Sequence, residues 1–159
     1  MAENDQQQTE RLFQVQRIYV KDLSFESPNA PNVFTGEWQP KHELNLNTKV
    51  NRVNDETFEV VLSVTVTTKM GEQTAFIVEV EQAGLIAIKG FPEPELGQLL
   101  GAYCPNLLFP YAREVISDLV SKGSFPQLVL QPVNFDALYA QHRQQMAQEN
   151  KAQPGKAAH

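Results

Sequence analysis

ETFEVVLSVTVTTKM, residues 56–70, is dense in valine and threonine, the residue types that favour β-strands. A turn is expected around Gly71, and residues 74–90 then predict a further strand with a bulge near Gly84. Upstream, residues 42–53 alternate apolar and polar side chains, which predicts another strand. These three segments follow one another so closely that an antiparallel meander is expected.

A long strand is also expected before the meander. Residues 13–26 alternate between two sets of side chains with the period of a β-strand. Since strict alternation puts every second side chain on the same face, Ile18, Val20, Asp22 and Glu26 are expected to share one face of the sheet.

After Gly90 the apolar residues recur with the period of a helix. Pro92 and nearby acidic residues favour a helix start, and residues 107–122 predict the strongest helix, with Pro110 near its first turn. Asn134 is expected to cap a last helix. The sequence therefore predicts an α+β domain in which a four-stranded antiparallel sheet is packed by two C-terminal helices.

Composition bounds the class of protein. The chain has 159 residues, of which 42% are hydrophobic and 20% charged, and this fits one soluble domain. We expect the domain to cover residues 12–147, with disordered tails at 1–11 and 148–159. A net charge of −6 disfavours nucleic-acid binding. No signal peptide and no run of about 20 apolar residues is found, which predicts a cytoplasmic protein without membrane insertion.

The sequence shows no recognisable catalytic or cofactor-binding motif. The single cysteine, Cys104, has apolar neighbours, a setting that raises the pKa of a thiol and predicts a buried packing residue rather than a nucleophile. Histidines are scattered, so no metal site is expected, and no glycine-rich phosphate loop is found. We therefore expect no enzyme activity and no cofactor.

Two surface features remain. Glu79 and Glu81 share the parity of Ile77, which predicts an acidic sheet face opposite the face that packs the helices. Such a face is either simply solvated or suited to a basic partner. The loop at 27–40, rich in proline and asparagine, carries Phe34 and Trp38, which either fold back on the core or wall a groove beside a strand.

A third feature is the apolar arc of the helix at 107–122. This arc is wider than one face of a four-stranded sheet requires, and self-association is therefore expected.

Three long blocks carry a resemblance: RIYVKDLSFESPNAPNVF (17–34), GAYCPNLLFPYAREVISDLVSKGSFPQL (101–128) and PVNFDALY (132–139). They closely resemble the SecB family of bacterial protein-export chaperones. The resemblance runs from about Phe13 to Tyr139.

The resemblance implies a homotetramer, a dimer of dimers, that binds unfolded precursor polypeptides without ATP. It also implies delivery to SecA, the translocation ATPase, whose zinc-bearing basic tail docks on the acidic sheet face. Position by position, the implied SecA-docking residues are Asp22, Glu26, Ile77 and Glu79. The implied client groove is formed by Phe34, Trp38, Leu44, Leu46 and Tyr139. The oligomer interface is expected at Val78, Val80, Tyr111, Val115 and Leu119.

Two other hypotheses stay open at this point. One is a small-molecule enzyme or ligand-binding domain at the Trp38 groove, which requires a polar residue inside the groove; the sequence offers no obvious one. The other is a SecB-like chaperone dedicated to one stress-module client rather than to export.

Overall fold

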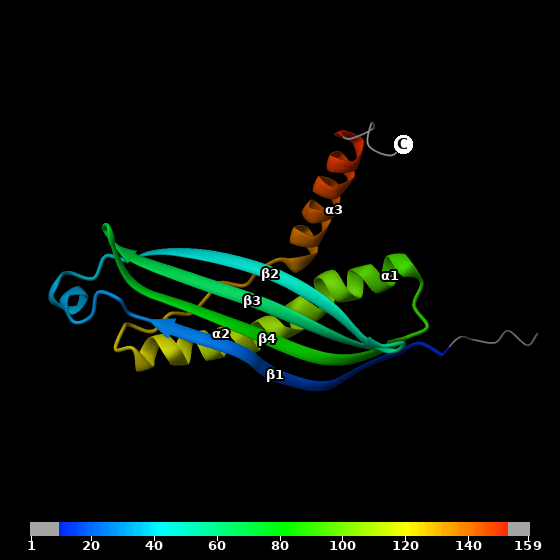
Figure 1. The fold of residues 1–159 in the computed structure, drawn as a ribbon, viewed down its shortest axis with the longest axis horizontal. Helices are drawn as coiled ribbons and strands as arrows, with labels where there is room; N and C mark the ends of the chain where they lie inside the picture. Colours follow the sequence, from blue (N-terminus) through cyan, green and yellow to red (C-terminus); the bar gives the residue numbers. More distant parts are fainter. Residues whose placement is uncertain (1–9, 153–159) are drawn as a thin grey trace, which may run out of the picture.

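The computed structural model describes residues 10–152. Its centre is a four-stranded antiparallel sheet in the order β1-β4-β3-β2, so the predicted meander is confirmed and the first strand joins the far side of β4 (Figure 1). The strands are β1 (Leu12–Glu26), β2 (Lys41–Asn54), β3 (Thr57–Met70) and β4 (Gln73–Lys89).

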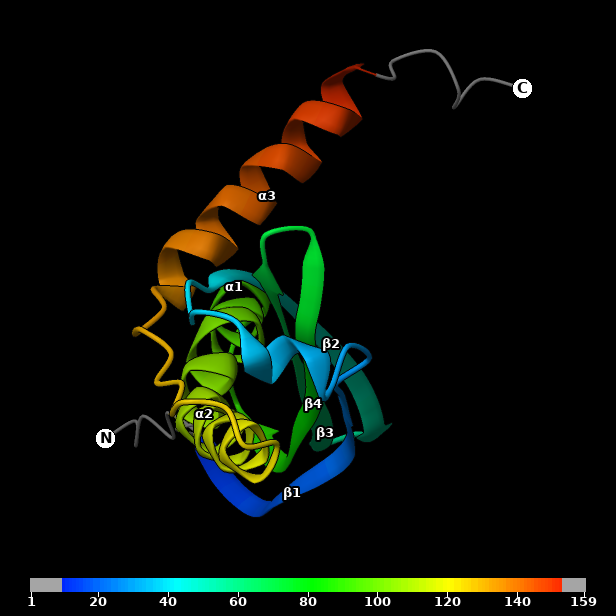
Figure 2. The same cartoon turned by 90° about the vertical axis from the view of Figure 1, so that its left-hand side faces the viewer.

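The helices follow the sheet in sequence, as expected for this α+β fold. They are α1 (Glu93–Gln98), the π-helical turn η2 (Leu99–Tyr103), α2 (Cys104–Lys122) and α3 (Phe135–Ala152), while a short 3₁₀ turn, η1 (Asn32–Thr35), lies in the first long loop. α2 lies along one face of the sheet, and α3 projects away from the body (Figures 1 and 2). Between residues 10 and 152, no helix is both long enough and apolar enough to cross a membrane.

The start of the strongest helix differs from the prediction. α2 begins at Cys104, so Pro110 lies in its interior rather than in its first turn. Just upstream, the Cys104 N–H donates to the carbonyl of Leu99, five residues back, as in a π-helical turn. Pro105 and Pro110 lack the N–H that an interior position normally donates, and the helix continues through both of them.

The two faces of the sheet differ in burial. Phe76, Val78 and Val80 of β4 are fully buried on the face that packs against the helices, together with Leu108 and Ile116 of α2. The opposite face, here called the open face, carries Ile77 and Glu79 as the alternation in β4 predicts.

The parity prediction for the first strand was wrong for two residues. The register of β1 against β4 shifts between Val15 and Arg17 and again between Val20 and Asp22. Each extra residue reverses the direction of the side chains that follow it. Ile18 and Val20 pair with Gly84 and Gln82 and so lie on the helix-packed face, whereas Asp22 lies on the open face. The irregularity that we expected in β4 near Gly84 is therefore found in the neighbouring strand.

The C-terminal helix is longer than predicted. The Oδ1 atom of Asn134 accepts the N–H of Ala137 at 3.0 Å, which confirms the predicted N-cap. The helix continues to Ala152, so residues 148–152 are helical and do not belong to the predicted C-terminal tail. The rest of both predicted tails, residues 1–9 and 153–159, lies outside the described residues.

Candidate functional site

The open face of the sheet gathers the four predicted docking residues. Glu26 lies directly opposite Ile77, and Ser24 lies opposite Glu79 on the neighbouring strand. Glu81 pairs with Asp22 on the same face and was not among the predicted docking residues, although its parity with Glu79 was evident in the sequence. We call these five residues the acidic patch: Asp22, Glu26, Ile77, Glu79 and Glu81.

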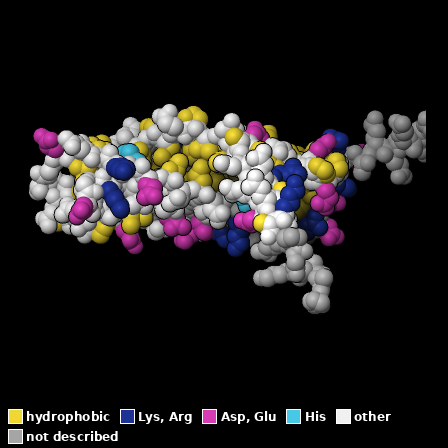
Figure 3. Space-filling model, turned by 90° about the horizontal axis from the view of Figure 1, so that it is seen from above, with side chains coloured by type: hydrophobic (Ala, Val, Ile, Leu, Met, Phe, Trp, Pro, Cys, Tyr) yellow, Lys and Arg dark blue, Asp and Glu magenta, His cyan; other side chains and the backbone are white. Residues whose placement is uncertain are grey.

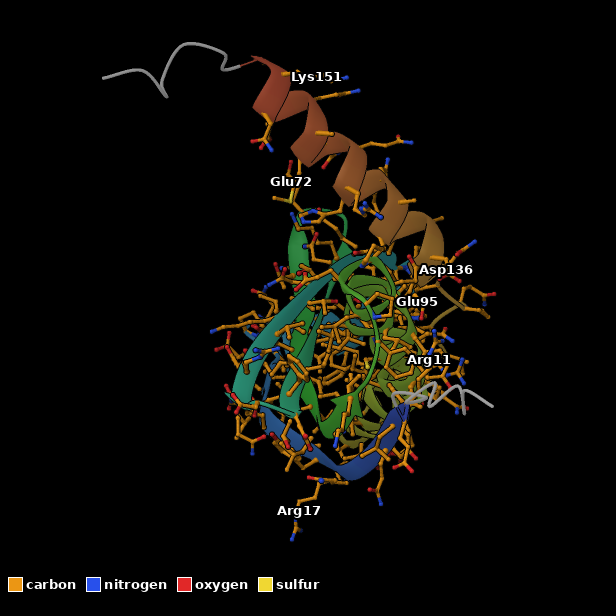
Figure 4. The ribbon with its side chains drawn as sticks, turned by 90° about the vertical axis from the view of Figure 1, so that its right-hand side faces the viewer. Arg11, Arg17, Glu72, Glu95, Asp136 and Lys151 are labelled. Atoms are coloured by element: carbon orange, nitrogen blue, oxygen red, sulfur yellow. The ribbon has the colours of Figure 1, made fainter. Side chains whose placement is uncertain are left out.

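The carboxylates of the acidic patch are not paired with nearby cationic side chains among residues 10–152. In the part of the chain that the structure describes, the ion pairs involve none of its carboxylates. Lys21, which precedes Asp22 in sequence, donates instead to Glu59 at 2.8 Å. Farther along β1, Arg17 points away from the body (Figure 4). The patch therefore presents uncompensated carboxylates beside a partly buried isoleucine, a surface complementary to a basic and partly apolar partner.

Next to the acidic patch, Glu59 is held by three neighbours. Lys21 donates to one of its oxygens, Tyr19 Oη donates to the other, and Asn51 adds a bond at 3.1 Å. The hydrogen bond from Lys21, followed by that from Tyr19, lowers the pKa of Glu59 from 4.5 to about 2. Burial, together with the neighbouring Glu59, raises the pKa of Tyr19 to about 12.

We expect this cluster to make stability depend on acid pH. Because the pKa of Glu59 is lower in the folded than in the unfolded chain, its contribution is complete above about pH 4.5 and is lost as the pH falls through about 2. Glu59→Gln is expected to reduce the free energy of unfolding at pH 7 by about 1.5–3 kcal/mol, the range for hydrogen bonds to a charged group. Urea titrations of both proteins between pH 2 and 7 will measure the difference, which should vanish at the acid end.

A matched control for Glu59 is Glu56→Gln. Glu56 faces Lys89 at 3.5 Å with both side chains about half exposed, a setting in which an ion pair contributes little. A difference between wild type and Glu59→Gln that stays constant from pH 7 to 2 would contradict the assignment.

The predicted client-groove residues fall into two groups on the helix-packed side. Phe34 and Trp38 surround Phe125, with ring centroids 5.1 and 5.7 Å away, and Phe34 remains 47% exposed. Phe125, which sequence reasoning missed, follows α2 in the chain, and only the fold brings it to the long loop. Leu44 of β2 is 39% exposed. Seen from above, hydrophobic side chains form a hollowed strip on this side (Figure 3).

The second group lies where β2 faces α3. Leu46 and Tyr139 line a groove of about 430 Å³ between these two elements. Its remaining lining residues are Asn47, Thr48, Val50, Gly101, Phe135, Leu138, Gln141, His142 and Gln145. The groove therefore does contain polar side chains, contrary to the sequence interpretation. Those on α3 are exposed amides and one imidazole, which suit hydrogen bonding to a polypeptide backbone.

The predicted oligomer-interface residues divide by burial. Tyr111 is 50% exposed on α2, and Val115 and Leu119 are partly buried on the same helix, so all three reach the surface. Val78 and Val80 do not: both are fully buried beneath α2, because their positions in β4 point toward the core. Their assignment to an interface is corrected to core residues that support α2.

Chemistry at the cysteine is disfavoured. Cys104 is fully buried in the core, and burial raises the pKa of its thiol to about 12, as its apolar neighbours predicted. His42 lies on β2 and bonds to Thr68 rather than to the thiol. Across residues 10–152, no cluster of three or more His, Cys, Asp or Glu side chains is arranged to hold a metal ion.

The arrangement of sheet and helices is that of a SecB-like fold. A solved structure of a Mycobacterium tuberculosis SecB-like chaperone in complex with an antitoxin peptide superimposes with a TM-score of 0.64, at 21% identity, covering 76% of this chain and 90% of that one. The family model described as preprotein translocase subunit SecB matches residues 5–146. The chain belongs to the SecB family.

Close relatives carry the same description. A protein-export protein SecB from Methylococcus capsulatus is 59% identical over 150 residues, covering 94% of this chain and 96% of the relative. Another, from Marinobacter nauticus, is 59% identical over 146 residues, covering 89% and 88%. This membership indicates a protein-export chaperone role rather than an enzymatic one.

Proposed function

We propose that this protein is an ATP-independent holdase of the cytoplasm, which captures unfolded precursor polypeptides and delivers them to SecA. The observation that carries the proposal is the separation of two unlike surfaces. The acidic patch lies on the open face of the sheet, whereas the apolar strip and the groove beside α3 lie on the helix-packed side. A client and a basic docking partner can therefore be held at the same time.

Client binding follows from the shape and lining of the strip. An unfolded chain exposes apolar side chains and unpaired backbone groups, and the strip offers Phe34, Trp38 and Leu44 for the former. The amides of Gln141 and Gln145 can donate hydrogen bonds to the latter and accept hydrogen bonds from them. Neither requirement specifies one sequence, so many precursors fit.

Assembly multiplies these contacts. We propose a homotetramer in which α2 provides the contacts between protomers through Tyr111, Val115 and Leu119. Linking several grooves in one particle raises avidity by roughly 10²–10⁴ without new contacts. Since a client that folds leaves the groove, slow-folding precursors are held longest.

A role in export is favoured over a dedicated stress-module client. The export proteins of M. capsulatus and M. nauticus are each 59% identical to this chain, whereas the chaperone bound to an antitoxin peptide is 21% identical. A compact small-molecule ligand is not favoured, because the groove is open and the polar side chains that line it on α3 are exposed.

The decisive experiment combines solution mass with a refolding assay. The protein is expected to run as a tetramer of its 17.9 kDa chain and to delay the refolding of a reduced, slow-folding precursor without nucleotide. A monomer that leaves refolding unchanged would refute the proposal.

Within that assay, Leu44→Asp is expected to weaken client binding about tenfold, equivalent to about 1.4 kcal/mol, because a charge replaces an apolar contact in the strip. The affinity is measured by titrating the delay in refolding. Val53→Asp is the matched control, since Val53 lies on the same strand, is 58% exposed and stands at the opposite end of that strand from Leu44. Equal loss in both variants would argue against a defined strip.

A further inference from the structure

α3 forms one wall of the groove, and few contacts hold this helix in place. α3 is buried at its first residue, Phe135, whose ring packs edge-on against Phe109 at 5.7 Å. From Asp136 to Ala152 every side chain except that of Tyr139 is exposed, and Leu138, for example, is 43% exposed. α3 otherwise projects from the body, as Figure 2 shows. A single buried residue allows a helix to swing, so a second contact must set its direction.

That second contact is a notch formed by two glycines. A Cβ atom at Gly101 would lie 2.4 Å from the Tyr139 ring, and one at Gly97 would lie 2.7 Å from Tyr139 Oη. Real Cβ atoms essentially never lie this close to another atom, so the ring sits against bare backbone of α1 and η2 and would have to move if either glycine gained a side chain. Arg143 covers the outer side of the ring, with its guanidinium 5.8 Å from the centroid.

Contacts beside the notch also hold the base of α3. Gln98, between the two glycines, donates to Asp136 at 2.8 Å, and Figure 4 places Asp136 at the base of α3. Gly101 lies within the π-helical turn, and such turns are frequent at functional positions.

We propose that Tyr139, seated in the notch of Gly97 and Gly101, is the positioning residue that holds α3 at a fixed distance from β2 and so sets the width of the client groove. The link to clients rests on the proposed function. The positioning of α3 by Tyr139 does not depend on that function.

A small displacement at Tyr139 becomes a larger one farther along α3. Tyr139 lies one turn beyond Phe135, about 6 Å along the helix, whereas Gln145 lies about 15 Å along it. A movement at Tyr139 is therefore enlarged about 2.5-fold at Gln145, which lines the groove. A methyl group at Gly97 would displace Tyr139 Oη by about 0.7 Å to reach ordinary contact distance.

The test uses the fact that the two glycines meet different atoms of Tyr139. A Cβ at Gly97 would clash with Oη alone, its next neighbour being Cζ at 3.9 Å, whereas a Cβ at Gly101 would clash with ring carbons. Removing the hydroxyl therefore relieves the first clash and not the second. Gly97→Ala should be rescued by Tyr139→Phe, and Gly101→Ala should not. Gly36→Ala, where nothing lies within 4 Å, is the control.

Two readouts are needed. Spin labels on Thr48→Cys and Gln145→Cys, in full-length chain diluted with unlabelled chain, report the distance across the groove, and the buried Cys104 does not compete for the label. In Gly97→Ala the distance distribution is expected to shift by about 2 Å or to broaden correspondingly. The dissociation constant for a reduced, unfolded polypeptide is expected to rise about tenfold, because fewer molecules hold the competent groove.

The outcomes separate the two proposals. A shift in Gly97→Ala that is reversed by Tyr139→Phe, while Gly101→Ala keeps its shift, supports the notch. An unchanged distance distribution in both alanine variants overturns it. If the wild-type protein binds no unfolded polypeptide, the proposed function fails, yet the distances still decide whether the notch positions α3.

Discussion

The double variant Asp22→Lys with Glu79→Lys is expected to lose about 100-fold or more of its affinity for SecA, while its affinity for unfolded clients stays within twofold of wild type. The reason is that both carboxylates lie in the acidic patch without a cationic partner among the described residues. Two reversed charges place like charges opposite a basic tail, which costs several kcal/mol at an interface.

Titration calorimetry with SecA measures this loss, and the refolding assay measures client binding. Docking to the wild type should also weaken as salt rises, since exposed charges are screened beyond about 8 Å at physiological ionic strength.

Asp55→Lys is the matched control for the charge reversal. Asp55 is an exposed carboxylate in the turn between β2 and β3, near the end of β4 where Thr57 pairs with Ala87, far along the sheet from the pair of Glu26 and Ile77. The substitution Asp55→Lys changes the net charge of the chain and leaves the acidic patch unaltered. Equal loss of SecA and client binding in the double variant would mean that the two surfaces are not independent.

The open face of the sheet illustrates how much the alternation of side chains can predict. The alternation in β4 placed Ile77 and Glu79 on the open face correctly, because that strand is regular along this stretch and a period of two then determines direction. β1 has the same alternation but contains two register shifts, and these reversed the prediction for Ile18 and Val20. A bulge is set by pairing with the neighbouring strand, which local sequence does not encode.

The groove was harder to predict for a different reason. Its aromatic end depends on Phe125 meeting Phe34 and Trp38, residues about 90 positions apart in the chain. Its other end depends on the seating of Tyr139 against Gly101, where the informative feature is a missing side chain. Periodicity identifies elements and their faces, but contacts between distant elements arise only from their packing.

Phe125→Ala is expected to lower the free energy of unfolding by about 3–5 kcal/mol, the range found when a buried aromatic side chain is truncated. Phe125 is 6% exposed and its ring contacts four other aromatic rings, those of Phe25, Phe34, Trp38 and Phe76, at centroid distances from 4.9 to 6.4 Å. The cavity left behind removes contacts from the core and from the long loop together. Urea unfolding at one fixed protein concentration measures the change, since assembly contributes to apparent stability.

The same variant also tests how the strip is built. Because Phe34 and Trp38 both lean on Phe125, losing its ring should release the long loop and weaken client binding, while SecA docking by the folded protein persists on the opposite face. Val129→Ala, in the same connecting segment but 58% exposed, should change the free energy of unfolding by less than about 0.5 kcal/mol. A loss below about 1 kcal/mol in Phe125→Ala would mean that the loop is held by other contacts. In that case the aromatic end of the strip would be a surface feature independent of the core.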